Sequence, residues 1–255
     1  MTEALRLHGI DKHFGGIQAL RQVSLSVAPG SLYGMIGPNG AGKTTLFNII
    51  TGFYQADAGH LQLFGQDVPL QQGPEQRVAL GVARTFQNIR LFAQMSVLDN
   101  VLVGRHLHAR TGLWSAILRT RAWRDDERRQ RDVAQACLAR VGIAARAQDT
   151  AAALSYGEQR RLEIARALAT EPRILALDEP AAGMNERERE QLADLLLGLR
   201  REGLTLLLIE HDMCLIASLC DRVLALDFGE VVIEADPASV RAHPRVIAAY
   251  LGEEA

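Results

Sequence analysis

The chain has 255 residues, of which 48% are hydrophobic and 23% charged, the balance of a globular protein with a full core. Its 28 basic and 30 acidic side chains give a net charge of −2, which argues against a general nucleic-acid binder with a basic excess. No apolar run approaches the roughly 20 residues that a membrane-spanning helix needs, and the N-terminus lacks the basic and apolar regions of a signal peptide.

The N-terminal part has the pattern of a β-rich unit. Residues 5–7 and 23–27 alternate apolar with polar side chains, the period of a half-buried strand. Residues 31–36 predict a third strand that ends at a Gly-Pro-Asn-Gly turn, and residues 59–64 predict a further short strand. Between them, residues 43–51 predict a helix, because their pattern is helical and Gly52 follows as a stop.

The middle of the chain, residues 96–141, is arginine-rich and mostly helical in its period. Gly112 and the acidic cluster at residues 125–127 are expected to interrupt it. Residues 124–132 alternate in charge and predict a solvated helix face. One apolar stripe is typical of packing against a core, while its tryptophan also leaves contact with a partner open; it consists of Leu113, Trp114, Ile117 and Leu118.

The last third returns to an alternation of strands and helices. Residues 174–177 and 204–209 are continuous apolar runs of the kind that parallel sheets bury on both faces. A polar helix is expected between them at residues 186–201. Residues 222–227 and 231–234 predict a hairpin, which short helices follow as far as Leu251.

Residues 37–44 read GPNGAGKT and fit the pattern G-x-x-x-x-G-K-[ST]. The glycines let the backbone turn so that successive N–H groups hold phosphate oxygens, and the helix that follows adds the positive end of its dipole. Lys43 is then placed to reach the β- and γ-phosphates, and the Thr44 hydroxyl to ligate Mg²⁺.

The lysine in this motif is itself a signal. Only two of the 28 basic side chains are lysines, Lys12 and Lys43. An ammonium is a compact point charge that fits a closed phosphate loop, whereas a guanidinium is larger and planar. The lysine at position 43 therefore supports a nucleotide site independently of the motif match.

The apolar strand at residues 174–177 ends in two carboxylates, Asp178 and Glu179. Alone this pattern is common at protein surfaces. Downstream of a phosphate loop it predicts that Asp178 holds Mg²⁺ through water and that Glu179 polarises the attacking water.

Residues 154–161 read LSYGEQRR and begin an amphipathic helix that is expected to reach Thr170. Ser155 as the N-cap and Glu158 three residues later form a capping box. A serine cap beside a glycine at a helix N-terminus is also a second phosphate-binding end, so the structural reading does not exclude a functional one.

This segment resembles the signature motif of ATP-binding-cassette (ABC) ATPases, and the other cassette motifs follow in the family's order. Phe14 matches the aromatic residue that stacks on adenine, where tyrosine is more usual. Gln87 matches the glutamine of the Q-loop, and His211 the switch histidine that contacts the γ-phosphate. Residues 182–185 match the D-loop, with Asn185 where aspartate is more typical.

The resemblance covers essentially the whole chain and is narrower than the ABC superfamily. Residues 83–92, 156–166, 179–185 and 246–252 are similar to the ATPases of branched-chain amino acid importers (LIV-type). Tyr156 and Asn185 depart from the wider superfamily but agree with this branch.

The resemblance implies an α/β fold, a P-loop NTPase cassette with a mixed RecA-like core, an antiparallel β-subdomain and an α-helical subdomain. Residues 1–255 would form a single nucleotide-binding domain, with the helical subdomain at residues 88–170 inserted in the core. It also implies an ATPase that uses ATP and Mg²⁺. The residues implied are Glu179, His211 and Gln87 for catalysis; Phe14, Gly37, Pro38, Asn39, Gly40, Ala41, Gly42, Lys43, Thr44 and Thr45 for ATP; Leu154, Ser155, Tyr156, Gly157 and Glu158 for the signature; Gly183 and Asn185 for the D-loop; and Thr44, Gln87 and Asp178 for Mg²⁺.

The family further implies a head-to-tail dimer with two ATP molecules between the chains, in which the signature acts on the partner's nucleotide. The second cassette is an identical or a different chain. Two separate transmembrane permease subunits and, indirectly, a periplasmic or extracellular solute-binding protein are the other expected partners, with no nucleic acid. The chain would then lie peripherally at the cytoplasmic face of the inner (plasma) membrane.

Several alternatives stay open at this stage. Similar ATPases serve urea or amide import and lipopolysaccharide export. A non-transport ABC ATPase acting on nucleic acid or ribosomes usually has two fused cassettes or a long coiled coil, which this sequence does not show. A generic P-loop kinase or GTPase is disfavoured by the segment from Leu154 to Gln159.

Overall fold

The computed structural model describes residues 3–108, 118 and 120–251. Within these ranges, four strands form an antiparallel sheet in the order β2-β1-β4-β5. Its members are β1 (Leu5–Phe14), β2 (Ile17–Val27), β4 (Ala58–Leu63) and β5 (Gln66–Asp67). The strand expected at residues 5–7 is longer than its alternation indicates, because register shifts beyond Leu7 break the period of two while the pairing with β2 continues.

A second sheet has the order β10-β9-β3-β8-β7-β6 and is parallel except for its last hairpin. Its central strands β3, β7 and β8 are buried along their whole length, as their continuous apolar runs predict. The strands are β3 (Leu32–Ile36), β6 (Val82–Arg84), β7 (Ile174–Asp178), β8 (Thr205–Ile209), β9 (Arg222–Asp227) and β10 (Glu230–Ala235).

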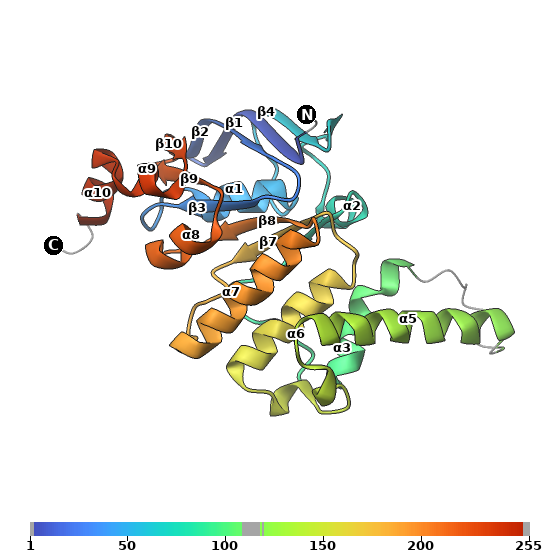
Figure 1. Cartoon of the computed structure of the whole chain (residues 1–255). Helices are drawn as coiled ribbons and strands as arrows, with labels where there is room; N and C mark the ends of the chain where they lie inside the picture. Colours follow the sequence, from blue (N-terminus) through green and yellow to red (C-terminus); the bar gives the residue numbers. More distant parts are fainter. Residues whose placement is uncertain (1–2, 109–117, 119, 252–255) are drawn as a thin grey trace.

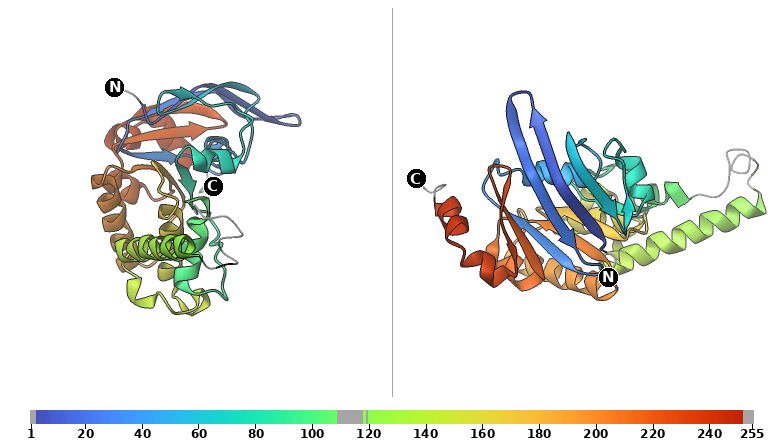
Figure 2. Two further views of the ribbon diagram at one scale, coloured as in Figure 1. Left: turned by 90° about the vertical axis from the view of Figure 1, so that its right-hand side faces the viewer. Right: turned by 90° about the horizontal axis from the view of Figure 1, so that it is seen from above.

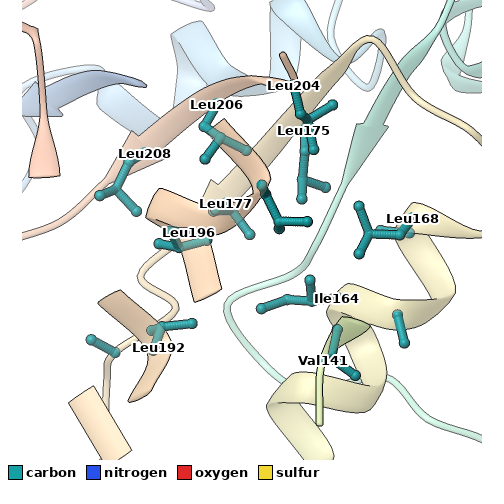
Figure 3. Packing of buried hydrophobic residues seen from close by; sticks show 14 of the residues in the cluster. Val141, Ile164, Leu168, Leu175, Leu177, Leu192, Leu196, Leu204, Leu206 and Leu208 are labelled. Carbon is teal, nitrogen blue, oxygen red and sulfur yellow. The ribbon is translucent and has the colours of Figure 1, made fainter. Parts of the chain in front are cut away.

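Side chains that alternate along the parallel strands enter two cores on opposite faces of this sheet. On one face, Ile174 and Leu207 pack with α1 (Lys43–Ile50) and the antiparallel sheet, which lies above α1 in Figure 1. On the other face, Leu175 and Leu206 pack against α6 (Tyr156–Leu168) and α7 (Glu186–Arg201), as Figure 3 shows. The remaining helices of this part are α2 (Pro74–Ala79), α8 (Met213–Leu219), α9 (Pro237–Arg241) and α10 (Pro244–Leu251).

The third part of the molecule is helical and consists of α3 (Val97–Gly104), α5 (Arg121–Arg140) and α6. Helix α5 projects from the body of the molecule in Figures 1 and 2. The short helices η1 (His106–His108), η2 (Ala144–Arg146) and η3 (Ala151–Ala153) lie in its connections. This arrangement of core, antiparallel sheet and helical part is the fold class that the sequence predicts.

One expectation about the middle of the chain is wrong and another holds only in part. The acidic cluster at residues 125–127 does not break the helix but lies inside α5, where Glu127 pairs with Arg131 one turn later. The face at residues 124–132 is not wholly solvated, because Asp126 is buried and accepts a hydrogen bond from Gln130. Of the expected apolar stripe, only Leu118 falls within the described residues, and it is exposed.

Within the described part of the chain, the helices are too short or too polar to cross a bilayer.

Candidate functional site

The glycine-rich loop of residues 37–42 joins the end of β3 to the start of α1. Gly37, Gly40 and Gly42 have φ values of 146°, 80° and 102°, in the region that favours glycine. A Cβ at Gly37 would lie 2.1 Å from the Leu226 carbonyl oxygen, so the loop is pressed against β9. Only a chain with glycine here can make this turn.

The N-terminus of the helix that follows the loop can bind an anion. Helix α1 has no side-chain N-cap, which leaves its first N–H groups available to a ligand. Lys43 is 6% exposed, and its Nζ donates to the carbonyl oxygens of Gly37 (2.5 Å) and Pro38 (2.9 Å). The Thr44 residue beside it is exposed. The loop thus combines backbone donors, one enclosed ammonium and an accessible hydroxyl.

A cavity of about 280 Å³ opens over this loop. Three residues that the sequence predicts from distant segments, Gln87, Glu179 and His211, line it together with the loop. They meet because β7 and β8 are parallel neighbours, with Asp178 opposite Ile209, so that residues just past both strands share one edge of the sheet. The other lining residues are Ala19, Asn39, Gly40, Ala41, Gly42, Lys43, Thr44 and Thr45.

The Glu179 carboxylate is held at both oxygens. Its Oε1 lies 2.5 Å from Nε2 of His211, and its Oε2 accepts a 2.7 Å hydrogen bond from Nε2 of Gln87. The Glu179 backbone has a φ of 47°, an uncommon value for a residue with a side chain, and its N–H donates to the Ile209 carbonyl. Backbone strain of this kind clusters at functional sites.

Asp178 is 3% exposed and lies behind Glu179, where it accepts a 2.8 Å hydrogen bond from Nη2 of Arg84. Burial raises the pKa of Asp178, and the Arg84 guanidinium opposes that rise. Arg84 also donates to Asn48 of α1 and to Thr51, which caps the end of that helix, and it lies among three aromatic rings. Sequence reasoning gave Arg84 no role, because its partners Asn48 and Asp178 lie 36 and 94 positions away.

The signature and D-loop segments lie beside one another, away from this cavity. Ser155 caps α6: its Oγ accepts from the Glu158 N–H (3.3 Å), and Glu158 accepts from the Ser155 N–H (2.8 Å), the predicted capping box. Asn185 caps α7 in the same way. A Cβ at Gly183 would lie 3.3 Å from the Tyr156 ring, so the two segments are in contact. Leu154 is buried.

Phe14 ends β1 and is 44% exposed, and it is not among the described residues that line the cavity. Its ring makes an edge contact with Tyr54, at 5.3 Å between centroids. The second lysine of the chain, Lys12, lies 5.2 Å from the centre of the Phe14 ring and pairs with Asp57 at 2.8 Å. This pairing gives Lys12 a structural role that the sequence did not indicate.

The C-terminal helix α10 reaches the start of the phosphate loop. The Tyr250 hydroxyl accepts a 3.0 Å hydrogen bond from the Gly37 N–H, across 213 positions of sequence. The loop is therefore held from two sides, by Tyr250 and by the close approach of the Leu226 carbonyl. Sequence reasoning missed this contact, because a single tyrosine in a terminal helix carries no signal for it.

Comparison with known proteins identifies relatives of this chain. The sequence model of the ABC transporter family matches residues 20–182, and that of branched-chain amino acid ATP-binding cassette transporters matches residues 231–255. The chain is 44% identical over 251 residues to the high-affinity branched-chain amino acid transport ATP-binding protein LivG of Escherichia coli (strain K12), with 98% of each chain covered. The corresponding protein BraF of Pseudomonas aeruginosa is 45% identical over the same share. Among solved structures, an ATP-binding cassette of an ABC transporter in its ADP conformation has a TM-score of 0.86 at 30% identity, covering 99% of this chain and 100% of that chain.

Proposed function

The chain belongs to the ABC transporter family, and we propose that it is the ATP-binding subunit of an importer of branched-chain amino acids. It is an ATPase that powers transport. The single structural observation that carries the ATPase activity is the cavity in which the glycine-rich loop meets Gln87, Glu179 and His211, and the solute rests on the relatives. A loop of backbone donors opposite a fixed carboxylate is the arrangement that phosphoryl transfer to water requires.

The residues present fit a nucleoside triphosphate. Negative charge is favoured by three groups at this site: the backbone donors of the loop, the α1 N-terminus and the Lys43 ammonium. Glu179 would orient a water molecule toward the terminal phosphate, and His211 and Gln87 would keep the carboxylate in position. Phe14 is our candidate for the adenine platform, since its ring is partly exposed at the end of β1.

Mg²⁺ also fits this site, because it prefers oxygen ligands and shares them with substrate phosphates. The Thr44 hydroxyl and the Gln87 side-chain oxygen would ligate it, and the buried Asp178 would hold one of its water molecules. When bound, the ion would neutralise charge that develops on the phosphate oxygens.

We further propose that two cassettes act together. Among the described residues, the cavity is lined by the loop, the first turn of α1, Ala19 and three residues past strands, and Ser155 and Gly157 are not among them. One cassette therefore leaves part of the γ-phosphate without donors, and the Ser155 end of α6 from a second cassette would supply them. The second cassette is either an identical or a different chain.

A groove of about 340 Å³ between the core and the helical part is the proposed docking site for a permease subunit. Phe92 and Val103, which are 50% and 41% exposed, line it together with Phe86 and Gly104. Phe86 precedes Gln87, so a permease segment in this groove would contact the loop that enters the nucleotide site. Two permease subunits would place the chain peripherally at the cytoplasmic face of the membrane, with a solute-binding protein on the far side.

Reconstitution tests the proposal. The chain would be combined in proteoliposomes with the permeases and solute-binding protein of a branched-chain amino acid importer, and ATP-dependent uptake of labelled leucine would be measured. Uptake with the wild-type chain and none with Lys43→Ala supports the proposal. Uptake of urea or an amide instead of leucine, isoleucine or valine would overturn the assigned solute while retaining the ATPase.

A further inference from the structure

An ion pair outside the nucleotide cavity is buried in the signature helix α6. Arg160 and Glu163 are 0% and 1% exposed, and Nη1 of Arg160 lies 2.9 Å from Oε2 of Glu163. Burying two charges is costly unless hydrogen bonds satisfy both partners well. The remaining bonds of this pair therefore indicate what it is for.

Those bonds go to the backbone just before and at Gln87. Arg160 donates from Nη1 to the Phe86 carbonyl oxygen (2.6 Å) and from Nη2 to the Gln87 carbonyl oxygen (2.8 Å). Glu163 accepts from the Phe86 N–H at 3.1 Å. The peptide groups on both sides of Phe86 are thus fixed in a stretch that belongs to no helix or strand. A guanidinium suits this role, because its planar fork directs donors from one rigid group to two successive carbonyls and a carboxylate.

The same guanidinium also faces the signature motif. Nη2 of Arg160 lies 3.4 Å from the Tyr156 hydroxyl, and its Cζ lies 6.0 Å from the centre of the Tyr156 ring. The Tyr156 ring in turn lies against Gly183 of the D-loop. Arg160 therefore lies at a junction of the signature, the D-loop and the segment that carries Gln87. The tyrosine in the signature motif has a physical reason here, since a smaller residue would reach neither Gly183 nor Arg160.

We propose that Arg160, held by Glu163, is a positioning residue that fixes Gln87 relative to the signature helix. The inference rests on the proposed function, in which Gln87 serves the chain's own nucleotide and Ser155 serves the partner's. The Gln87 side chain donates to Glu179, so a displaced Gln87 backbone would also release one oxygen of that carboxylate. Arg160 then makes the glutamine of one site and the serine of the other move as one unit.

The test uses the purified full-length chain with ATP and Mg²⁺. Arg160→Lys keeps the charge opposite Glu163 but loses the fork, and the double variant R160Q/E163Q removes both charges together in case the first variant folds poorly. Each is expected to lower kcat about tenfold or more, the usual cost of losing a group that orients a ligand, with a much smaller change in KM for ATP. Arg131→Gln is the matched control, because Arg131 also pairs with a glutamate of its own helix, Glu127 of α5, but lies outside the signature segment; its kcat should equal that of the wild type.

A double-mutant cycle separates positioning from a structural role. On a Gln87→Ala background, Arg160→Lys is expected to lower kcat no further, since the residue through which it acts is gone. Independent, multiplying losses in the cycle, or a wild-type kcat in both folded Arg160 variants, would overturn the inference. A wild-type chain that hydrolyses no ATP would instead overturn the proposed function, so the two failures are distinguishable.

Discussion

Nε2 of His211 lies 2.5 Å from Oε1 of Glu179, and the two residues come from the ends of neighbouring parallel strands. The other carboxylate oxygen accepts from Gln87, which reaches the site from the end of β6. The carboxylate is thus fixed at the edge of the cavity before any ligand enters. Such preorganisation avoids a reorganisation cost in the reaction itself.

Glu179→Gln should bind ATP but lose hydrolysis by about 10²- to 10⁴-fold, the range that a general base contributes. The phosphate loop is unchanged in this variant, so ATP affinity should persist, and dimers held by uncleaved ATP should accumulate. Single-turnover hydrolysis and light scattering after gel filtration would measure both effects. Glu202→Gln is the matched control, because Glu202 is exposed and pairs with Arg140 instead. Normal hydrolysis by Glu179→Gln would mean that Glu179 is not the base.

Lys43→Ala should abolish hydrolysis and weaken ATP binding, because the only ammonium among the described cavity-lining residues is removed. Lys43→Arg should fail as well. The Lys43 side chain is enclosed, with Nζ against the carbonyls of Gly37 and Pro38, so the larger planar guanidinium does not fit. Titration with a fluorescent ATP analogue and a phosphate-release assay would compare the two variants. Wild-type turnover in Lys43→Arg would contradict the argument from size.

The sequence predicts those features whose signals are local. The strand at residues 174–177 is confirmed because its apolar run is buried on both faces, and the capping box of Ser155 and Glu158 because it depends on a spacing of three. The contacts of Arg84, Arg160 and Tyr250 were not predictable, because their partners lie 94, 73 and 213 positions away. Pairs of this kind are determined by strand order and helix packing, which no local pattern reports.

Arg84→Met should destabilise the chain by about 3 kcal/mol, the cost of leaving a buried charge without its partner. The carboxylate left without a partner is that of Asp178. Burial already raises the pKa of this group in the wild type. Without the guanidinium the pKa of Asp178 rises further. A folded-state pKa above the unfolded value means that stability falls as pH rises from the unfolded pKa through the folded one. The deficit of Arg84→Met should therefore be largest at neutral pH and shrink on acidification.

Urea unfolding of wild type and Arg84→Met at several pH values checks this. The double variant R84M/D178N carries neither charge and should recover most of the lost stability at pH 7. If the double variant is as unstable at pH 7 as Arg84→Met, the loss comes from packing among the three phenylalanine rings and not from the unpaired carboxylate.

Asp57→Asn should remove a small, pH-dependent stabilisation of the β1 end. The hydrogen bond from Lys12 is the main cause that lowers the pKa of Asp57, and the His13 N–H adds to it. A lowered folded-state pKa gives stability that is present above the unfolded pKa of about 4 and lost as pH falls through the folded value. The pair is partly exposed, so the contribution at pH 7 should be within about 1 kcal/mol. Thermal unfolding from pH 2 to 7 measures it, and a wild-type advantage that is independent of pH would exclude the ion pair as its source.

Tyr250→Phe should weaken ATP binding without unfolding the chain. The variant keeps the ring and removes only the hydroxyl that accepts from the Gly37 N–H, at the first residue of the phosphate loop. A hydrogen bond of this kind contributes about 1 kcal/mol. If ATP binds only to the loop conformation that this bond stabilises, its loss corresponds to about a fivefold rise in the Kd for ATP. Tyr250→Ala also removes the ring, which packs against the core, and should lose stability in addition.

The comparison of these two variants isolates the hydroxyl. Isothermal titration with ATP and thermal unfolding would be measured on both, so that affinity and stability are read separately. An unchanged Kd in Tyr250→Phe would mean that the other contacts of the loop, which include the hydrogen bonds from Lys43 to the Gly37 and Pro38 carbonyls, hold it without the Tyr250 hydroxyl. A raised Kd at unchanged melting temperature would show that the Tyr250 hydroxyl supports ATP binding through the Gly37 N–H. Helix α10, which carries Tyr250, would then be part of the nucleotide site.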